Sequence, residues 1–246
     1  MHIELLGKWK PSFSFWYGTD EESVRDLLPA NFSAQTKNGK AFWNVFFARM
    51  NRMRPAGLPV WCGIDSWLIT YSIYVSTRVE ASGIVNGLYV VGSQAEPKFV
   101  SKIQSVLPNL NLHPAEIDLE LQGWLLNLNI KTEHLNVLEI DSNAAASPFE
   151  SSSFDNLAES LDFFKYRSRL LSASGDFIEF SELTDQRQHR IMDVRGDWNF
   201  LSRFNQHSVK LELATRLEPA SFYWVSGKRE RFVKTPVVIP ELATAH

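Results

Sequence analysis

The sequence predicts a mainly β (α+β) protein of one domain, with a barrel or sandwich of antiparallel strands and a few short helices. Runs rich in Val, Ile, Tyr, Trp and Thr recur along the chain, often alternating with polar residues, as half-buried strands do. Aromatic residues make up 13% of the chain, with eight tryptophans, which suits an interior lined with rings. Strand-like runs lie on both sides of the polar segment 141–153, so we expect one domain over residues 1–246 with a flexible surface loop there.

The first half of the chain alternates strands with turn signals. Thr19 and Glu22 have the spacing of a capping box, which predicts a short helix that ends before Pro29. The pair Asn38-Gly39 predicts a tight turn, and the Met-, Arg- and Pro-rich segment 49–59 a loop. The expected strands cover residues 12–18, 41–48, 66–78 and 86–94, and a helix is expected over 97–107.

The second half adds further β structure. The alternation over 117–130 predicts a β ribbon, and the turn residues Ser174–Asp176 predict a hairpin between 163–171 and 177–183. A short helix is expected near 197–204. The late strands are expected over 208–216, 221–226 and 233–239.

Composition excludes several functional classes. The net charge is −3, and the basic run Lys228–Arg231 is short, so we expect a solvent-exposed turn there and no nucleic-acid partner. The single cysteine, Cys62, excludes an internal disulfide. No apolar run is long enough to span a bilayer and no secretory segment is evident, so we expect a cytoplasmic protein without a membrane partner. The six histidines lack metal-site spacing, so neither a metal nor a cofactor is expected.

Several segments, in this order, are similar to a known superfamily. They are Trp16–Pro29, Lys40–Met50, Gly57–Pro59, Tyr71–Val75, Gly87–Val91 and, weakly, Phe164–Arg167. Together they resemble the acetoacetate decarboxylase-like superfamily, and within it the branch known as domain of unknown function 2071. The resemblance runs from about residue 14 to about 110 and then patchily to about 180. It implies a closed, cone-like antiparallel β barrel with an internal pocket.

The same resemblance marks Lys98 as the candidate catalytic residue. The stretch Gly92–Phe99 is similar to the family's Gly-Arg-Glu and Pro-Lys-Lys segment, whose lysine forms a Schiff base. A lysine attacks only as a neutral amine, and in acetoacetate decarboxylase itself a neighbouring cation lowers its pKa. Here Phe99 replaces that neighbour and Ser93-Gln94 replaces the Arg-Glu pair, while Lys102 could approach Lys98 as an i,i+4 neighbour. The catalytic motif is therefore incomplete.

Other residues could bind a ligand, although each has a plainer interpretation. The two lysines follow the polar face of an amphipathic helix, and such a face usually meets water. The remaining polar candidates would otherwise be strand-face or surface residues. The candidate substrate-binding residues are Arg78, Glu96, Lys102, Tyr166 and Arg167.

Three functions stay open at this point. The leading hypothesis is an acetoacetate decarboxylase-like barrel that binds a small organic acid or an apolar ligand in its internal pocket. The first alternative is a Schiff-base lyase, a decarboxylase or dehydratase that acts on a keto acid through Lys98. The second is a non-catalytic, lipocalin-like carrier. A small molecule is the expected partner in each, and a homo-oligomer remains open.

Overall fold

The computed structural model describes most of the chain as strands. The described residues are 3–10, 12–103, 110–122, 125–130, 140–141, 151–165, 168–185, 189–191, 193–194, 201, 204–206, 208–217 and 219–233. The strands are β1 (Ile3–Trp9), β2 (Ser12–Asp20), β3 (Ser33–Ala34), β4 (Thr36–Lys37), β5 (Lys40–Pro55), β6 (Ile64–Val79), β7 (Gly83–Ala95), β8 (Leu112–Pro114), β9 (Ile117–Gln122), β10 (Leu125–Ile130), β11 (Ile140–Asp141), β12 (Arg169–Ser174), β13 (Phe177–Asp185), β14 (His189–Ile191), β15 (Asp193–Val194), β16 (Lys210–Leu217) and β17 (Ser221–Arg231). The helices are α1 (Glu22–Arg25), α2 (Pro97–Ile103), α3 (Leu157–Phe163) and the 3₁₀ helix η1 (Val60–Cys62).

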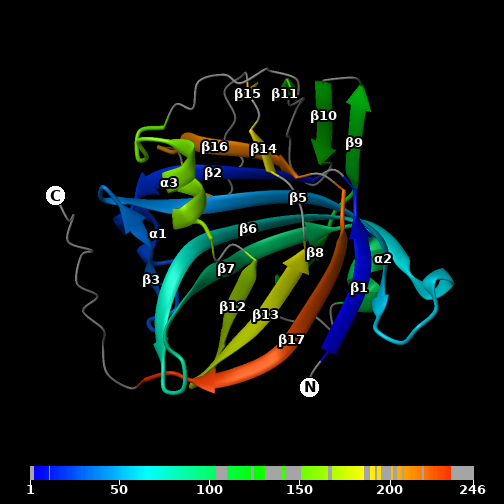
Figure 1. Ribbon diagram of the computed structural model, residues 1–246, viewed down its shortest axis with the longest axis horizontal. Coiled ribbons are helices and arrows are strands. Elements are labelled where there is room, and N and C mark those ends of the chain that lie inside the picture. Colours follow the sequence, from blue (N-terminus) through cyan, green and yellow to red (C-terminus); the bar gives the residue numbers. More distant parts are fainter. Residues whose placement is uncertain are drawn as a thin grey trace.

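Seven strands of the described chain close into a barrel, in the order β5, β1, β17, β13, β12, β7 and β6, with β6 pairing back to β5 (Figure 1). The predicted closed, mainly β architecture is therefore confirmed. Strands from both sides of segment 141–153 share the ring. Within this ring the pairings are antiparallel except for β7 with β12, which is parallel. The connection between these two strands carries α2 and α3, as a parallel pair requires a long crossover.

The long strand β5 joins the barrel to an extension of the same sheet. Its first part pairs with β2, where Lys40 lies opposite Asp20, and its last part pairs with β1, where Pro55 lies opposite Leu5. Strands β16 and β14 continue the sheet beyond β2. Because side chains alternate across a strand, the two faces of β5 contribute to two different buried clusters. Trp43 and its odd-numbered neighbours belong to one buried cluster, and the even-numbered positions face the other side.

Several local predictions are confirmed. Asn38 and Gly39 have φ angles of 52° and 73°, and they turn the chain between β4 and β5 as an Asn-Gly pair favours. Gly175, at φ 58°, makes the predicted turn between β12 and β13. The expected strands at 66–78, 86–94, 208–216 and 221–226 correspond to β6, β7, β16 and β17, and the ribbon at 117–130 to β9 and β10.

Four local predictions are wrong. The capping box does not form, because Thr19 still pairs in β2 and α1 begins only at Glu22, without a side-chain cap. Segment 49–59 is strand as far as Pro55, since β1 supplies a pairing partner that the prediction omitted. Segment 163–171 is not one strand, because α3 extends to Phe163 and β12 begins at Arg169. Residues Lys228–Arg231 are not a turn but the end of β17, paired with β13.

Other predictions fall on residues that are not described. These are the end of the helix over 97–107, most of the loop over 141–153, most of the helix near 197–204 and the strand over 233–239. Within the described residues, no helix combines the length and the apolar character needed to cross a membrane.

Candidate ligand-binding cavity in the barrel

The barrel encloses a cavity of about 410 Å³. This volume lies in the usual range for small-molecule sites. Each of the seven ring strands contributes at least one lining residue, and β2, β16 and the segment after α3 complete the wall. The lining residues are Trp9, Ser14, Trp16, Asn44, Phe46, Leu68, Thr70, Leu88, Lys165, Ser168, Leu170, Leu183, Thr184, Leu217 and Trp224. The cavity is thus a product of barrel closure rather than of any one segment.

Packed aromatic rings make one side of the cavity. Trp9 lies 4.4 Å from Phe222 and 5.8 Å from Phe46, measured between ring centroids. Such tilted and edge-on contacts hold each ring in place. Trp224 is buried beside them, and its indole N–H has no hydrogen-bond partner among the described residues. A buried donor of this kind is available to a ligand that carries an acceptor.

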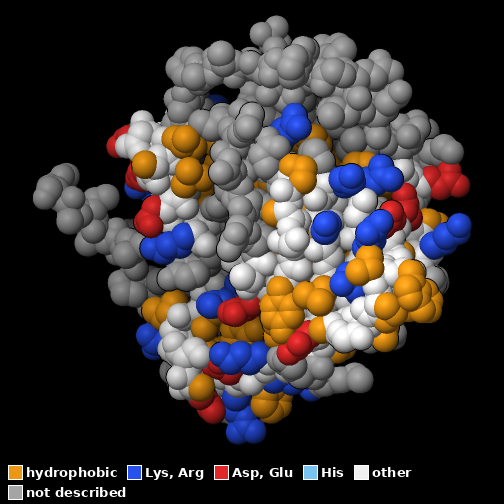
Figure 2. All heavy atoms as spheres, turned by 45° about the vertical axis from the view of Figure 1, so that its right-hand side comes forward, with side chains coloured by type: hydrophobic (Ala, Val, Ile, Leu, Met, Phe, Trp, Pro, Cys, Tyr) orange, Lys and Arg blue, Asp and Glu red, His pale blue; other side chains and the backbone are white. Residues whose placement is uncertain are grey.

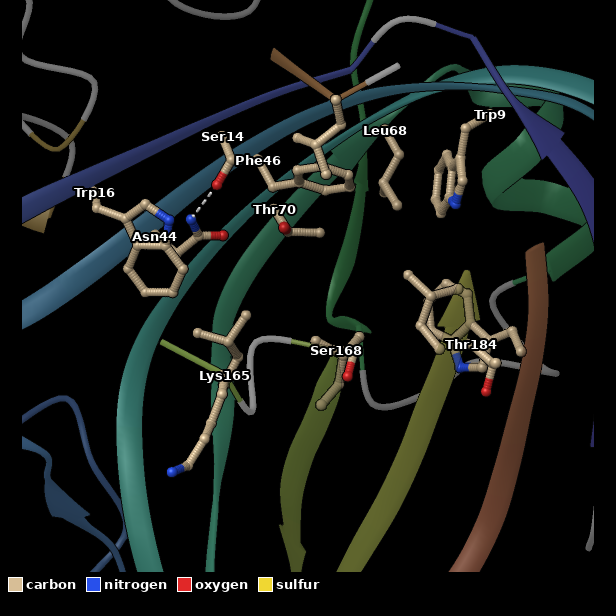
Figure 3. Close-up of a pocket in the computed structure, with 15 residues that line it drawn as sticks. Trp9, Ser14, Trp16, Asn44, Phe46, Leu68, Thr70, Lys165, Ser168 and Thr184 are labelled. Carbon is tan, nitrogen blue, oxygen red and sulfur yellow. Dashed lines mark hydrogen bonds between the residues drawn. The ribbon is translucent and has the colours of Figure 1, made fainter. Parts of the chain in front are cut away.

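A small group of uncharged polar residues lies among the apolar ones. Asn44 Nδ2 donates to Ser14 Oγ at 2.7 Å, and both side chains are buried. Figure 3 shows this pair facing each other, with Thr70 beside the carboxamide oxygen of Asn44. Because Nδ2 is engaged by Ser14, Asn44 offers its Oδ1 as an acceptor toward the cavity. The cavity can therefore orient a ligand by hydrogen bonds that involve no charge.

Helix α3 and its flanking residues pack further rings against Trp16, which lines the cavity. Phe164 stacks on Trp16 with centroids 3.8 Å apart, and Phe154 and Phe163 pack around it. Asn156 Oδ1 caps the helix by accepting from the Glu159 N–H at 2.9 Å.

Two contacts attach this region to the sheet. Lys37 Nζ lies 2.5 Å from Glu159, and its hydrogen bond lowers the pKa of that carboxyl group. The buried Glu212 on β16 accepts hydrogen bonds from Ser151 and Ser152, including one from the Ser152 N–H at 2.8 Å. The aromatic border is therefore fixed at several points.

Charge is almost absent from the cavity. Among the described residues that line it, Lys165 is the one charged side chain. Its ammonium group lies 3.3 Å from Asp162, and the side chain is 54% exposed. Figure 3 shows Lys165 at one edge, with Nζ directed away from Ser168 and Thr184. No carboxylate lines the cavity within the described part of the chain. Nor does that part hold a group of three or more His, Cys, Asp or Glu residues able to bind a metal.

The structure places Lys98 outside this cavity. It lies in the first turn of α2, is exposed and does not line the cavity, whereas its neighbour Phe99 is buried. The family resemblance did not reveal this separation. It rests on the similarity of a segment of sequence, and that similarity does not tell whether Lys98 faces the barrel interior. The catalytic role of Lys98 stays a prediction.

Of the other predicted site residues, the structure describes the side chains of Glu96 and Arg78, and neither lines the cavity. Glu96 is half-buried beside α2, where burial raises the pKa of its carboxyl group and the nearby Arg49 guanidinium partly offsets that rise. Arg78 is exposed on β6, where it pairs with Ile84. The Lys102 side chain and residues 166–167, Tyr166 and Arg167, lie outside what the structure describes.

Sequence reasoning missed the residues that do line the cavity. One signal was present: Asn44 is the single strongly polar residue in the apolar run 41–48. An amide in a buried strand requires a partner, so it marks a polar point in the interior. Trp9 gave no such signal, because its strand, β1, was not predicted.

Comparison with known proteins identifies the architecture. No protein-family model matches the chain. No curated protein matches it either. Solved structures do match. Acetoacetate decarboxylase from Legionella pneumophila superposes with a TM-score of 0.59 at 11% identity, covering 93% of this chain and 86% of that one. The chain has the acetoacetate decarboxylase-like fold.

Two further structures agree. An acetoacetate decarboxylase-like enzyme from Sphingomonas wittichii gives a TM-score of 0.58 at 10% identity, over 94% of this chain and 92% of that one. The enduracididine biosynthesis enzyme MppR, solved in complex with pyruvate, gives 0.51 at 7% identity, over 92% and 89%. At sequence identities this low, the structural similarity establishes the fold and not the activity. The narrower resemblance to domain of unknown function 2071 stays a prediction.

Proposed function

We propose that this protein binds a small, uncharged and mainly apolar molecule in the barrel cavity. The observation that carries the proposal is the cavity wall itself, which all seven ring strands build from apolar, aromatic and uncharged polar side chains. Burial of apolar ligand surface against such a wall is favourable by about 25 cal/mol per Å². The Trp224 N–H and the Asn44 carboxamide would orient one polar group of the ligand.

The near absence of charge on the described cavity wall favours a neutral ligand over a carboxylate. A carboxylate moved into an apolar cavity loses its hydration, and the cost is large unless a cation compensates it. Among the described lining residues, the one cation is Lys165, at the edge of the cavity. A neutral ketone, alcohol or aromatic ring meets no such cost. The simplest activity of this site is binding without chemistry, as in a carrier.

Displacement of a neutral fluorescent dye, N-phenyl-1-naphthylamine, tests the proposal. We expect an uncharged aromatic ketone to displace the dye at least about tenfold more effectively than the carboxylate of the same shape. Leu170→Trp should fill the cavity and abolish dye binding. Ile84→Trp, a matched substitution at an exposed position, should leave binding intact. Equal dye binding by both variants would contradict the proposed site.

A small organic acid is the second candidate, and two observations favour it. The ammonium group of Lys165 stands at the cavity edge, and the structural relative MppR has been solved with pyruvate bound. An acid would place its apolar part in the cavity and its carboxylate at Lys165. In that case the carboxylate would displace the dye better than the ketone, and Lys165→Met would remove that preference without changing the affinity for the ketone.

A further inference from the structure

The hairpin between β5 and β6 ends in an exposed apolar tip, residues 58–61, which the cavity does not use. Trp61 is 84% exposed, and Leu58 and Val60 are 47% and 44% exposed. Figure 1 shows the hairpin projecting from the barrel on the side of α2, and Figure 2 shows apolar side chains gathered on that side of the molecule. Single exposed apolar residues are common, but a cluster at a projecting tip marks a contact surface.

The tip is held in one conformation by its own hydrogen bonds. Arg54 Nε donates to the Leu58 carbonyl at 2.9 Å, and its Nη1 donates to the Arg52 carbonyl at 3.1 Å. Further backbone bonds within the tip join Leu58 N to Pro55 O, Cys62 N to Pro59 O and Gly63 N to Val60 O. Backbone groups that are already paired can enter an apolar environment at low cost. The tip therefore presents apolar side chains on a largely satisfied backbone.

The segment around the tip is basic, although the whole chain is acidic. Residues 52–61 contain two arginines, Arg52 and Arg54, and no acidic residue, whereas the chain as a whole has a net charge of −3. The carboxylate of Asp65, on the returning strand β6, accepts a hydrogen bond from the Arg52 N–H at 2.7 Å. A positive rim around an apolar tip is complementary to a surface that is negative outside and apolar inside. An anionic lipid leaflet has this arrangement.

We infer that the tip docks on an anionic lipid surface. Trp61 would lie at the level of the headgroups, where indole rings are favoured, with Leu58 and Val60 beside it and Arg52 and Arg54 near the lipid phosphates. A protein partner fits less well, because three side chains fall well short of the roughly 800 Å² that each side of a stable interface buries. The sequence predicted no membrane partner because no segment could span a bilayer. Peripheral docking needs no spanning segment.

Co-sedimentation of the full chain with vesicles tests this inference. We expect binding to vesicles of equal parts phosphatidylcholine and phosphatidylserine, and little binding to phosphatidylcholine alone. Trp61→Ser should weaken partitioning by about tenfold. Arg52→Gln should weaken it by about fivefold, as loss of one basic residue near the surface implies. Ile84→Ser and Lys210→Gln, at exposed positions outside the tip, should leave partitioning unchanged.

The single cysteine supplies an independent measurement. Cys62 adjoins Trp61 and is partly accessible, so it can carry an environment-sensitive fluorophore. We expect its emission to shift to the blue with the anionic vesicles, and the same label at Ile84→Cys in a Cys62→Ala background not to shift. Absence of vesicle binding, or equal binding by Trp61→Ser, would overturn the inference. So would a dimer in sedimentation analysis that Trp61→Ser dissociates, because the tip would then join two copies of the chain.

Discussion

The barrel cavity and the N-terminal turn of α2 differ in where they hold charge. The described residues that wall the cavity are uncharged except for Lys165 at its edge. The turn of α2 presents the exposed Lys98 beside the half-buried Glu96, with Arg49 close to that carboxyl group. The segment that resembles a reactive motif and the space that could hold a substrate are thus separate. A motif read along a chain does not reveal which side of a barrel its side chains face.

The largest expected effect concerns catalysis at α2. We expect carbon dioxide release from acetoacetate to be slower than that of an efficient enzyme by about four orders of magnitude. The reason is that the adjacent lysine and the acidic partner are both replaced, and each loss plausibly costs about a hundredfold. Borohydride trapping with a panel of keto acids, analysed by peptide mass spectrometry, checks the chemistry directly. An adduct on Lys98 that Lys98→Ala removes would show that the N-terminal turn of α2, and not only the barrel cavity, binds a substrate.

The second prediction concerns the aromatic border of the cavity. Phe164→Ala should lower the free energy of unfolding by about 3–5 kcal/mol, because it removes a fully buried ring stacked on Trp16. Urea denaturation followed by fluorescence measures the change. Phe177→Ala is the matched control, since that ring is 39% exposed and should cost less than about 1 kcal/mol. Similar losses in both variants would mean that α3 does not support the cavity.

The third prediction sharpens the polar character of the cavity. Asn44→Leu should weaken binding of a hydroxyl-bearing ligand by about tenfold, the usual worth of one hydrogen bond. The hydrocarbon analogue of that ligand should bind as before, so it serves as the internal control. Isothermal titration calorimetry of both ligands measures the difference. If both affinities fall together, Asn44 shapes the cavity rather than recognising a polar group.

The smallest expected effect is a pH dependence of α3. The hydrogen bond from Lys37 lowers the pKa of Glu159, so this pair stabilises the folded state above the usual carboxyl pKa of about 4.3. That stability is lost as the pH falls through the lowered pKa. The pair is partly exposed, so we expect less than about 1 kcal/mol. Urea midpoints of Lys37→Met and the unaltered chain should differ at about pH 7, and the difference should shrink as the pH falls through the lowered pKa of Glu159. A difference that persists in acid would exclude the carboxylate as its cause.

Local chemistry in the sequence determined much of the secondary structure. The Val-, Ile- and Tyr-rich runs of β6 and β7 are typical of strands with extensive burial, and most of β6 is buried on both faces. The Asn38-Gly39 turn follows from the φ angles that these residues tolerate. The resemblance to acetoacetate decarboxylase-like proteins also predicted the closed barrel. These features depend on residues close together in the chain or on the order of whole segments.

Tertiary contacts decided the rest. Strand β5 extends to Pro55 because β6 pairs with it as far as Met53 and β1 as far as Pro55. Helix α3 is stabilised by packing Phe164 on Trp16, which is far away in the sequence. The cavity exists only after seven strands close, so no segment by itself encodes its volume or its neutral lining. Exposure is decided in the same way: Phe99 is buried while the adjacent Lys98 is not, and Trp61 is exposed at the tip although its side chain is apolar. Burial is a property of the assembled fold, because it depends on which distant residues cover a side chain.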